Sequence, residues 1–131
     1  MSRQGDELRR KLARDTGRVK AELTIEIAAN LDREMPVDTG WARANTIPSV
    51  GAPVTAPVGS PDSIDTGAAA AGAAEVLANQ RPDADLYVSN HVPYVSILDA
   101  THPTAAGMIE RSIEQGVATV RARVAARKVE L

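Results

Sequence analysis

The chain has 131 residues, a formal net charge of −2 and no cysteine. This length suits one domain, so we expect residues 1–131 to form a single domain. The absence of cysteine excludes a disulfide framework and any thiolate metal site. With no Phe, one Trp and two Tyr, the core must be built largely from small apolar side chains, which bury little area each.

The charges are unevenly distributed along the chain. Residues 1–20 hold seven basic and three acidic side chains, and residues 120–131 hold four basic and one acidic. The acidic excess therefore lies in the middle. The polar N-terminus lacks the apolar stretch of a signal peptide, and no apolar run approaches the roughly 20 residues that cross a bilayer. We expect a protein made in a cytoplasm, without a membrane partner.

A long first helix is expected from about Asp6 to Glu34, within the N-terminal segment 1–35. Apolar residues recur there at three-, four- or seven-residue steps, which draws one stripe along a helix. The stripe comprises Leu8, Leu12, Val19, Leu23, Ile27 and Leu31. Gly17 weakens the helix without breaking it, and Pro36 ends it. The charged first half of the helix is expected to project from the body.

A turn and a proline-rich segment follow. Residues 36–40 (PVDTG) read as a turn, and residues 41–50 are expected to be an extended strand. Four prolines then arrive every four or five residues, at Pro48, Pro53, Pro57 and Pro61. This spacing forbids a helix or a central strand, so residues 47–65 are expected to be a long arm that can reach a neighbouring subunit.

The second half of the chain alternates helices and short strands. An Ala-rich helix is expected from Gly67 to about Gln80, capped by Thr66. Residues 85–89 alternate as a strand, and residues 94–98 form another strand or a helical turn. The last helix is expected over 104–128, with one face made of Ile109, Ile113, Val117, Val120 and Val124. The predicted fold is α+β, a small antiparallel sheet packed with three helices and carrying a long Pro-rich arm.

Two stretches resemble a known family. The sequence PVDTGWARAN at 36–45 follows the first helix, and LYVSNHVPYV at 86–95 leads through Gly107, Met108 and Ile109 into the last helix. Together they are similar to the head–tail joining, or tail-completion, family of lambda-like long-tailed bacteriophages. There a PVDTG turn opens a strand, and an N-x-x-P-Y turn joins a strand to the following segment.

The resemblance implies a structural protein of the virion's head–tail junction and not an enzyme. Its subunits would form a ring, expected to be a hexamer, that contacts adjoining neck and tail-tube proteins. Genome DNA would pass through the ring without sequence-specific binding, repelled by the acidic middle of the chain. Subunit contacts are expected at Trp41, Arg43, Pro53, Pro57, Pro61 and Tyr94, and contacts between rings at Arg9, Arg10 and Arg14.

Catalytic and metal chemistry find weak support in the sequence. A lone Asp-Thr-Gly at 38–40 lacks the second carboxylate that an aspartic protease needs. Ser89, His91 and Asp99 suggest a triad, but no glycine-rich nucleophile elbow surrounds the serine. Two histidines without cysteine make a poor zinc site, even with Asp99 as a third ligand. We expect no cofactor, and a hydrolase or metalloprotein using His91, His102 and Asp99 stays a rival hypothesis.

A second rival is a small nucleic-acid-binding protein. The basic side chains Arg9, Arg10, Lys11, Arg14 and Arg18 lie on one predicted helix and could contact a phosphate backbone. Acidic side chains are interspersed among them, which favours a solvated face or a docking surface for an acidic neighbour. Trp41 could equally be an interface anchor or the centre of the core.

Overall fold

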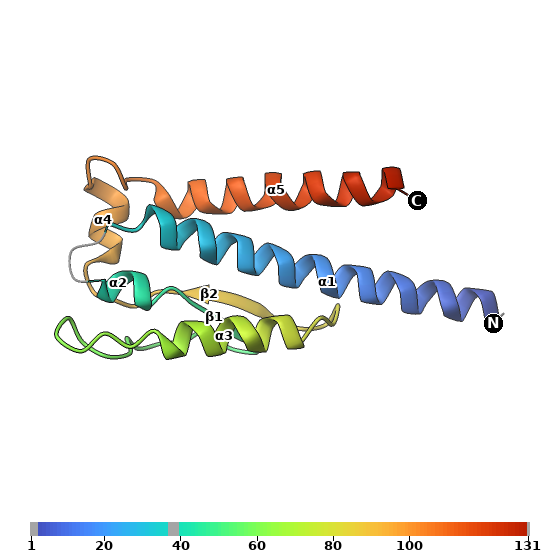
Figure 1. The fold of residues 1–131 in the computed structure, drawn as a ribbon, viewed down its shortest axis with the longest axis horizontal. Helices are drawn as coiled ribbons and strands as arrows, with labels where there is room; N and C mark the ends of the chain where they lie inside the picture. The colour runs from blue at the N-terminus through green and yellow to red at the C-terminus, as the bar shows by residue number, and fades with distance from the viewer. Residues whose placement is uncertain (1–2, 37–39, 131) are drawn as a thin grey trace.

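A computed structural model of the protein describes residues 3–36 and 40–130, with side chains through Arg127. Its elements are, in chain order, α1 (Arg3–Glu34), α2 (Trp41–Ala44), β1 (Ile47–Val50), α3 (Gly67–Ala78), β2 (Leu86–Ser89), α4 (Val95–Thr101) and α5 (Met108–Glu130) (Figure 1). The fold is α+β, with a two-stranded antiparallel sheet, as the sequence predicts. In the part of the chain that the structure describes, no helix is long and apolar enough to cross a membrane.

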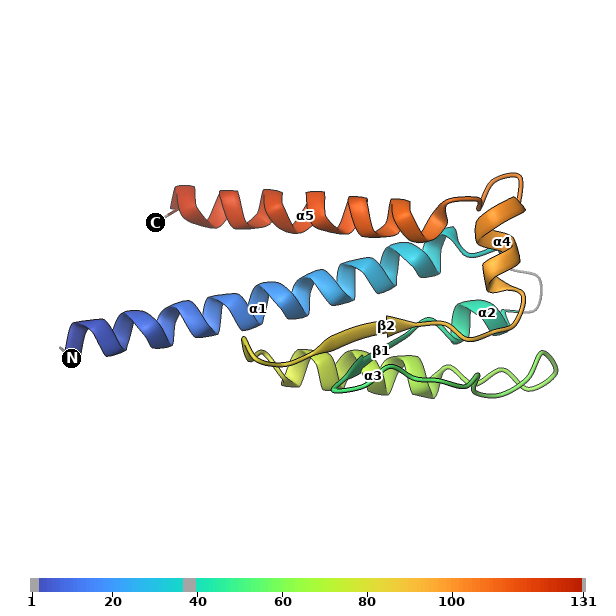
Figure 2. The ribbon, with the colours of Figure 1, turned by 180° about the vertical axis from the view of Figure 1, so that it is seen from behind.

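The elements stack in layers. Helix α5 lies along α1, the sheet and α3 lie on the other side of α1, and α3 runs beside β1 (Figures 1 and 2). Helices α2 and α4 close one end of these layers. The N-terminal part of α1 extends past the end of α5, as the charge pattern predicts.

Small residues let α1 approach the sheet closely. Its buried residues include Ala21, Thr24 and Ala28, and the larger Leu31 where the core begins. Gly17 is buried as well. It packs so closely on the α3–β2 loop that a Cβ there would lie 2.1 Å from the carbonyl oxygen of Gln80. A position that weakens the helix by about 1 kcal/mol therefore serves tertiary packing.

The strand expected at residues 41–50 is only partly present. Gly40 has a φ of +84°, and residues 41–44 then form the single helical turn α2. The Asn45 N–H bonds back to the carbonyls of Trp41 and Ala42, both at 3.2 Å, so the strand begins only at Ile47. These local backbone hydrogen bonds hold residues 41–45 in a helical turn in place of the extended strand expected there. The remainder of the PVDTG turn, residues 37–39, lies outside the described residues.

Strand β1 can contain Pro48 because the backbone of this residue faces away from β2, where no N–H is needed for strand pairing. The register pairs Ile47 with Ser89 and Pro48 with Val88, so Pro48 turns its backbone away from β2. Its carbonyl points at Gly72 of α3, where a Cβ would lie 2.0 Å from the oxygen. The predicted arm therefore starts after Val50, because residues 47–50 belong to the sheet.

Helix α3 is capped by a residue other than the predicted one. The Thr66 side chain makes no capping hydrogen bond and its backbone is already helical. The Asp65 Oδ1 instead accepts a hydrogen bond of 2.8 Å from the Gly67 N–H. Helix α3 ends at Ala78, two residues before the predicted end.

The last two helices correct two further expectations. Residues 95–101 form α4, which settles the choice between strand and helix. Helix α5 begins at Met108 and not at Thr104, because residues 103–107 form turns that end at Gly107 with φ +77°. Its buried face is Met108, Ser112, Gly116 and Val120, and the predicted face is wrong at its first two members, since Ile109 and Ile113 are 41% and 44% exposed.

The hydrophobic core lies where α1 ends and α5 begins. Its buried members are Leu31, Met35, Ala42, Val92, Val95, Ala105 and Met108. Trp41, Val88, Tyr94 and Leu98 pack against this cluster and are partly buried. Trp41 is thus at the margin of the core, and two methionines fill its centre.

Candidate functional site

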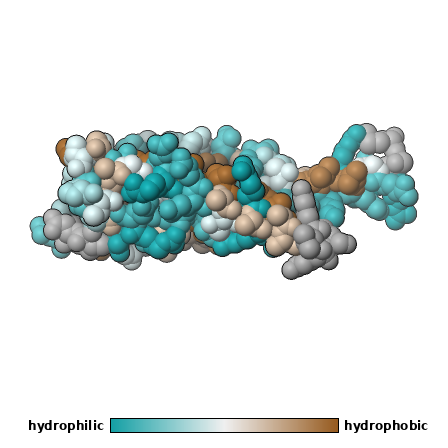
Figure 3. Space-filling view, turned by 90° about the horizontal axis from the view of Figure 1, so that it is seen from above, coloured by the Kyte–Doolittle hydropathy of each residue, from teal (hydrophilic) through white to brown (hydrophobic). Residues whose placement is uncertain are grey.

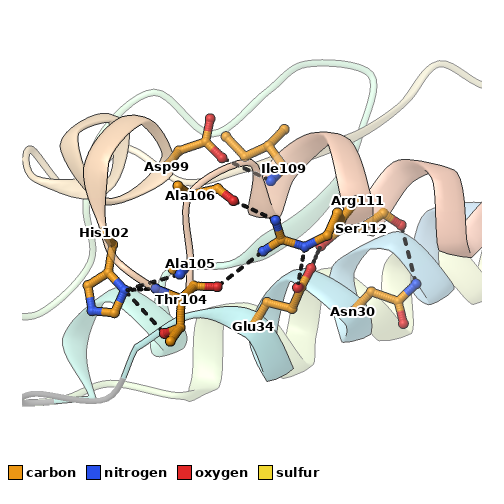
Figure 4. A network of polar contacts seen from close by, with 10 residues as sticks. All are labelled: Asn30, Glu34, Asp99, His102, Thr104, Ala105, Ala106, Ile109, Arg111 and Ser112. Atoms are coloured by element: carbon orange, nitrogen blue, oxygen red, sulfur yellow. Dashed lines mark hydrogen bonds and ion pairs between the residues drawn. The ribbon is translucent and has the colours of Figure 1, made fainter.

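Asp99 and His102, which the rival hydrolase or metalloprotein hypothesis uses, both organise the α4–α5 turn (Figure 4). The Asp99 Oδ1 accepts a 3.0 Å hydrogen bond from the Ile109 N–H, in the first turn of α5. His102 Nδ1 accepts hydrogen bonds from the Thr104 and Ala105 N–H groups at 3.2 and 3.1 Å. These contacts satisfy backbone donors that a helix start leaves open.

A partly buried polar network continues from this turn to α1. Arg111 Nε donates to Glu34 Oε1 at 2.8 Å, and its Nη1 donates to the Ala106 carbonyl at 2.5 Å. The fully buried Ser112 donates to the other Glu34 oxygen at 3.3 Å, and Asn30 Nδ2 donates to the Ser112 carbonyl (Figure 4). Among the described residues no buried side-chain polar atom lacks a partner. The network therefore joins α1 to α5 and to the turn before it, and its buried polar side chains are satisfied within the described chain.

Ser89 and His91, the other residues considered for a triad, are not part of this turn. His91 is exposed and Ser89 belongs to β2, facing β1 across the register. Over residues 3–36 and 40–130, no cluster of three His, Cys, Asp or Glu side chains could hold a metal ion. Asp99 and His102 thus have positions that helix geometry explains.

Three carboxylates of α1 form ion pairs with arginines of α5. Glu22 pairs with Arg127 at 2.6 Å and Glu26 with Arg123 at 2.6 Å, along with the Glu34–Arg111 pair. Glu22, Glu26 and Glu34 lie on one face of α1, because their separations of four and eight residues repeat the helical turn, and none of the three pairs is predicted above. Arg123 and Arg127, two of the four basic side chains in residues 120–131, are consequently engaged within the chain.

The Glu22 carboxylate has a shifted pKa. Burial raises the pKa, but hydrogen bonds and charges from Arg127 and Arg18 outweigh this effect and lower it below the ordinary 4.5. Arg18 bonds from the same helix at 3.1 Å, and Arg127 contacts both carboxylate oxygens. Glu22 is therefore held in its charged form by two guanidinium groups.

The predicted ring-to-ring residues lie on the projecting part of α1. Arg9, Arg10 and Arg14 are exposed and form no ion pair with another described residue. Leu8 and Leu12 beside them are 58% and 57% exposed, and Figure 3 shows hydrophobic surface on this projection. The segment presents both charge and apolar surface outside the body.

The predicted subunit-contact residues Trp41, Arg43 and Tyr94 contact their own chain. The Trp41 and Tyr94 rings lie 6.2 Å apart, and Trp41 Nε1 donates to the Val58 carbonyl at 3.0 Å. Arg43 Nε donates to the Met35 carbonyl at 2.9 Å, which caps the end of α1. Asn90 Nδ2 donates to the Ala42 carbonyl at 2.7 Å. The two stretches that carry the family resemblance thus pack against each other.

The proline-rich arm is fastened at one point. Asn45 holds Val58 through two hydrogen bonds, accepting from its N–H at 2.7 Å and donating to its carbonyl at 3.0 Å. Pro53, Pro57 and Pro61 are exposed. Within the described chain, the backbone of residues 53–57 forms no hydrogen bond. Residues 53–57, before the fastening, are exposed apart from the half-buried Val54.

An apolar groove beside β2 is the feature that sequence reasoning missed. Helix α1 supplies Leu23, Ile27 and Leu31, α5 supplies Ile109 and Ile113, and β2 supplies Leu86 and Val88. Its volume is about 320 Å³. A larger hollow of about 560 Å³ lies between α1 and α3, but alanines line much of it. The groove differs because it adjoins an open strand edge.

Comparison of the chain with models of protein families, with curated proteins and with solved structures found no match.

Proposed function

We propose that this protein is a structural subunit that assembles with copies of itself into a ring at the head–tail junction of a tailed bacteriophage or a particle derived from one. The observation that carries the assembly role is the open edge of β2 beside an apolar groove. Open strand edges are surfaces on which another chain adds. The phage setting rests on the resemblance of residues 36–45 and 86–95.

The described polar side chains support a structural role. Asp99, His102 and Arg111 are engaged in helix caps and helix-to-helix contacts. Exposed apolar side chains gather on the projecting part of α1 and on α4 and α5, where Ile97 is 61% exposed. Exposed apolar patches are typical of surfaces that contact another protein.

The first test is the mass of the purified protein by light scattering across a concentration series, with negative-stain images of the same samples. Closed rings of one size are the expected result. Mixing the protein with phage heads or with tail tubes, over a range of salt concentrations, then tests the setting. A protein that stays monomeric at all concentrations and binds neither particle would overturn the proposal.

Nucleic-acid binding is the second candidate, favoured by the exposed arginines of the projecting helix. It predicts that the monomer binds duplex DNA with an affinity that falls steeply with salt. Replacing Arg9, Arg10 and Arg14 with Gln would lower the slope of log affinity against log salt by about 1 for each lost phosphate contact. Unchanged binding in this variant would exclude the projecting helix as the DNA-contacting surface.

A further inference from the structure

The two edges of the sheet differ in what covers them. The edge of β1 is closed by Pro48, which has no N–H, and by α3, whose Gly72 meets the Pro48 carbonyl. The edge of β2 has neither a proline nor a charged side chain among residues 86–89. Of the two strands that the structure describes, β2 therefore has the edge on which a strand can add.

The register identifies which groups of β2 face outward. The Gly51 N–H bonds to the Asp85 carbonyl at 2.8 Å, so Asp85 and, by alternation, Tyr87 and Ser89 direct their backbone groups toward β1. The N–H and C=O groups of Leu86 and Val88 then point away from β1. Among the residues that the structure describes, none bonds to these four groups.

A strand added beside β2 would lie over an apolar surface. Val88 packs toward the core on the α1 side of the sheet, and Leu86, two residues earlier, shares that face. Beyond the strand edge, the same layer continues as Leu23 and Ile27 of α1 and Ile109 of α5, which line the groove. A third strand added at this edge would therefore cover Ile109 and Ile113 of α5, which are half-exposed.

The arm supplies a segment with matching groups. In an extended chain over residues 53–57, the backbone groups of Val54 and Ala56 point to one side and those of Pro53, Thr55 and Pro57 to the other. The first side carries two N–H and two C=O groups, at the spacing of Leu86 and Val88. The second side carries two prolines, which have no N–H and would block addition of a further strand.

We propose that residues 53–57 of a second copy add antiparallel to the outer edge of β2, with Val54 opposite Val88 and Ala56 opposite Leu86. Four backbone hydrogen bonds form in this register, and the Val54 and Ala56 side chains face the groove, because opposed residues share a face. A neighbouring projecting helix cannot occupy the site equally well, since its own backbone groups are already bonded. The inference rests on the proposed function, because passing arms from subunit to subunit is how a ring would close.

The test uses the absence of native cysteine. In the proposed register Thr55 lies opposite Tyr87 as a pair without hydrogen bonds, with Cα atoms about 4.5 Å apart, which suits a disulfide. A Thr55→Cys protein and a Tyr87→Cys protein are mixed under mild oxidant. Each has a single cysteine, so the 55–87 disulfide can form only between the two proteins. A disulfide-linked heterodimer, identified by intact mass, is expected. Pro53→Cys with Tyr87→Cys, on the same face but two residues out of register, is the matched control and should link at least about tenfold less.

A second pair of variants keeps the test independent of disulfide chemistry. Ala56→Pro removes a donor that faces β2 and is expected to weaken self-association about tenfold, the effect of roughly one lost hydrogen bond. Thr55→Pro removes a donor that faces away and should leave association unchanged. Both changes lie in an exposed loop and spare the fold.

The outcomes separate this inference from the proposed function. The inference is overturned if oligomers form without the 55–87 disulfide, or if the 53–87 disulfide forms equally well. The proposed ring-forming function would still stand in that case. Linked open chains that never close support the strand addition and contradict the ring. A monomer that never links overturns both.

Discussion

At the scale of single residues, glycines decide how closely the layers approach. Gly17 and Gly72 both sit in helices against backbone carbonyls, of Gln80 and Pro48 respectively, at distances that leave no room for a methyl group. Gly116 differs, because its nearest neighbour is the side chain of Ile27, which can rotate.

Gly17→Ala is therefore expected to destabilise the protein. In an isolated helix the change would stabilise by about 1 kcal/mol, but the added Cβ must displace the backbone at Gln80, at a cost of about 1–3 kcal/mol. Urea unfolding measures the sign. Gly116→Ala is the control and should cost less; a more stable Gly17→Ala protein would contradict the packing described here.

The ion pairs of Glu22 predict a pH dependence. Because its pKa is lowered in the folded chain, the folded protein binds fewer protons than the unfolded chain near and below pH 4.5. The stabilisation by Glu22 is complete above that pH and is lost as the pH falls through the folded-state pKa.

Glu22→Gln should lower the free energy of unfolding at pH 7 by about 1 kcal/mol and flatten its decline in acid. Thermal unfolding from pH 7 to pH 3 measures both effects. Glu75→Gln, at an exposed position on α3, should match the unchanged protein at every pH, and an equal loss in both variants would rule out the Arg127 contact as the cause.

At the scale of elements, the α4–α5 turn shows how polar residues that suggest chemistry serve helix geometry. Asp99 accepts from the first turn of α5 and His102 accepts from the preceding turn. Both side chains satisfy N–H groups that have no partner within a helix.

Asp99→Ala should lower the free energy of unfolding by about 1 kcal/mol through the loss of this cap. Asp99→Asn retains an oxygen that can accept the same hydrogen bond, so its stability should stay within about 0.5 kcal/mol of the original protein. Denaturant titrations of the two variants distinguish them. If Asn costs as much as Ala, the carboxylate charge matters and a role beyond capping must be considered.

At the scale of the whole molecule, the two halves of α1 have different surroundings. From Gly17 onward it is the central layer, between α5 and the sheet, and before that it projects with Leu8 and Leu12 exposed. Of the predicted apolar stripe only Leu31 is buried; Val19, Leu23 and Ile27 are half-buried, and Leu8 and Leu12 are exposed.

Leu31→Ala is expected to cost about 2–5 kcal/mol, whereas Leu8→Ala should change the free energy of unfolding of the monomer by less than about 0.5 kcal/mol. Unfolding at concentrations low enough to keep the protein monomeric makes the comparison clean. A large cost at Leu8 would mean that the projecting segment packs on the body.

The sequence by itself determined the long first helix, the Ala-rich helix, the last helix and the strand at 86–89, because periodicity, Pro36 and turn residues act over a few positions. The tertiary structure decided which faces are buried. Helix α5 packs through Ser112 and Gly116 because small residues allow a close approach to α1, and this leaves Ile109 and Ile113 at the groove. The pairing of Glu22 with Arg127, the closure of one sheet edge by α3 and the open edge of β2 all join segments distant in sequence, and no local pattern encodes such contacts.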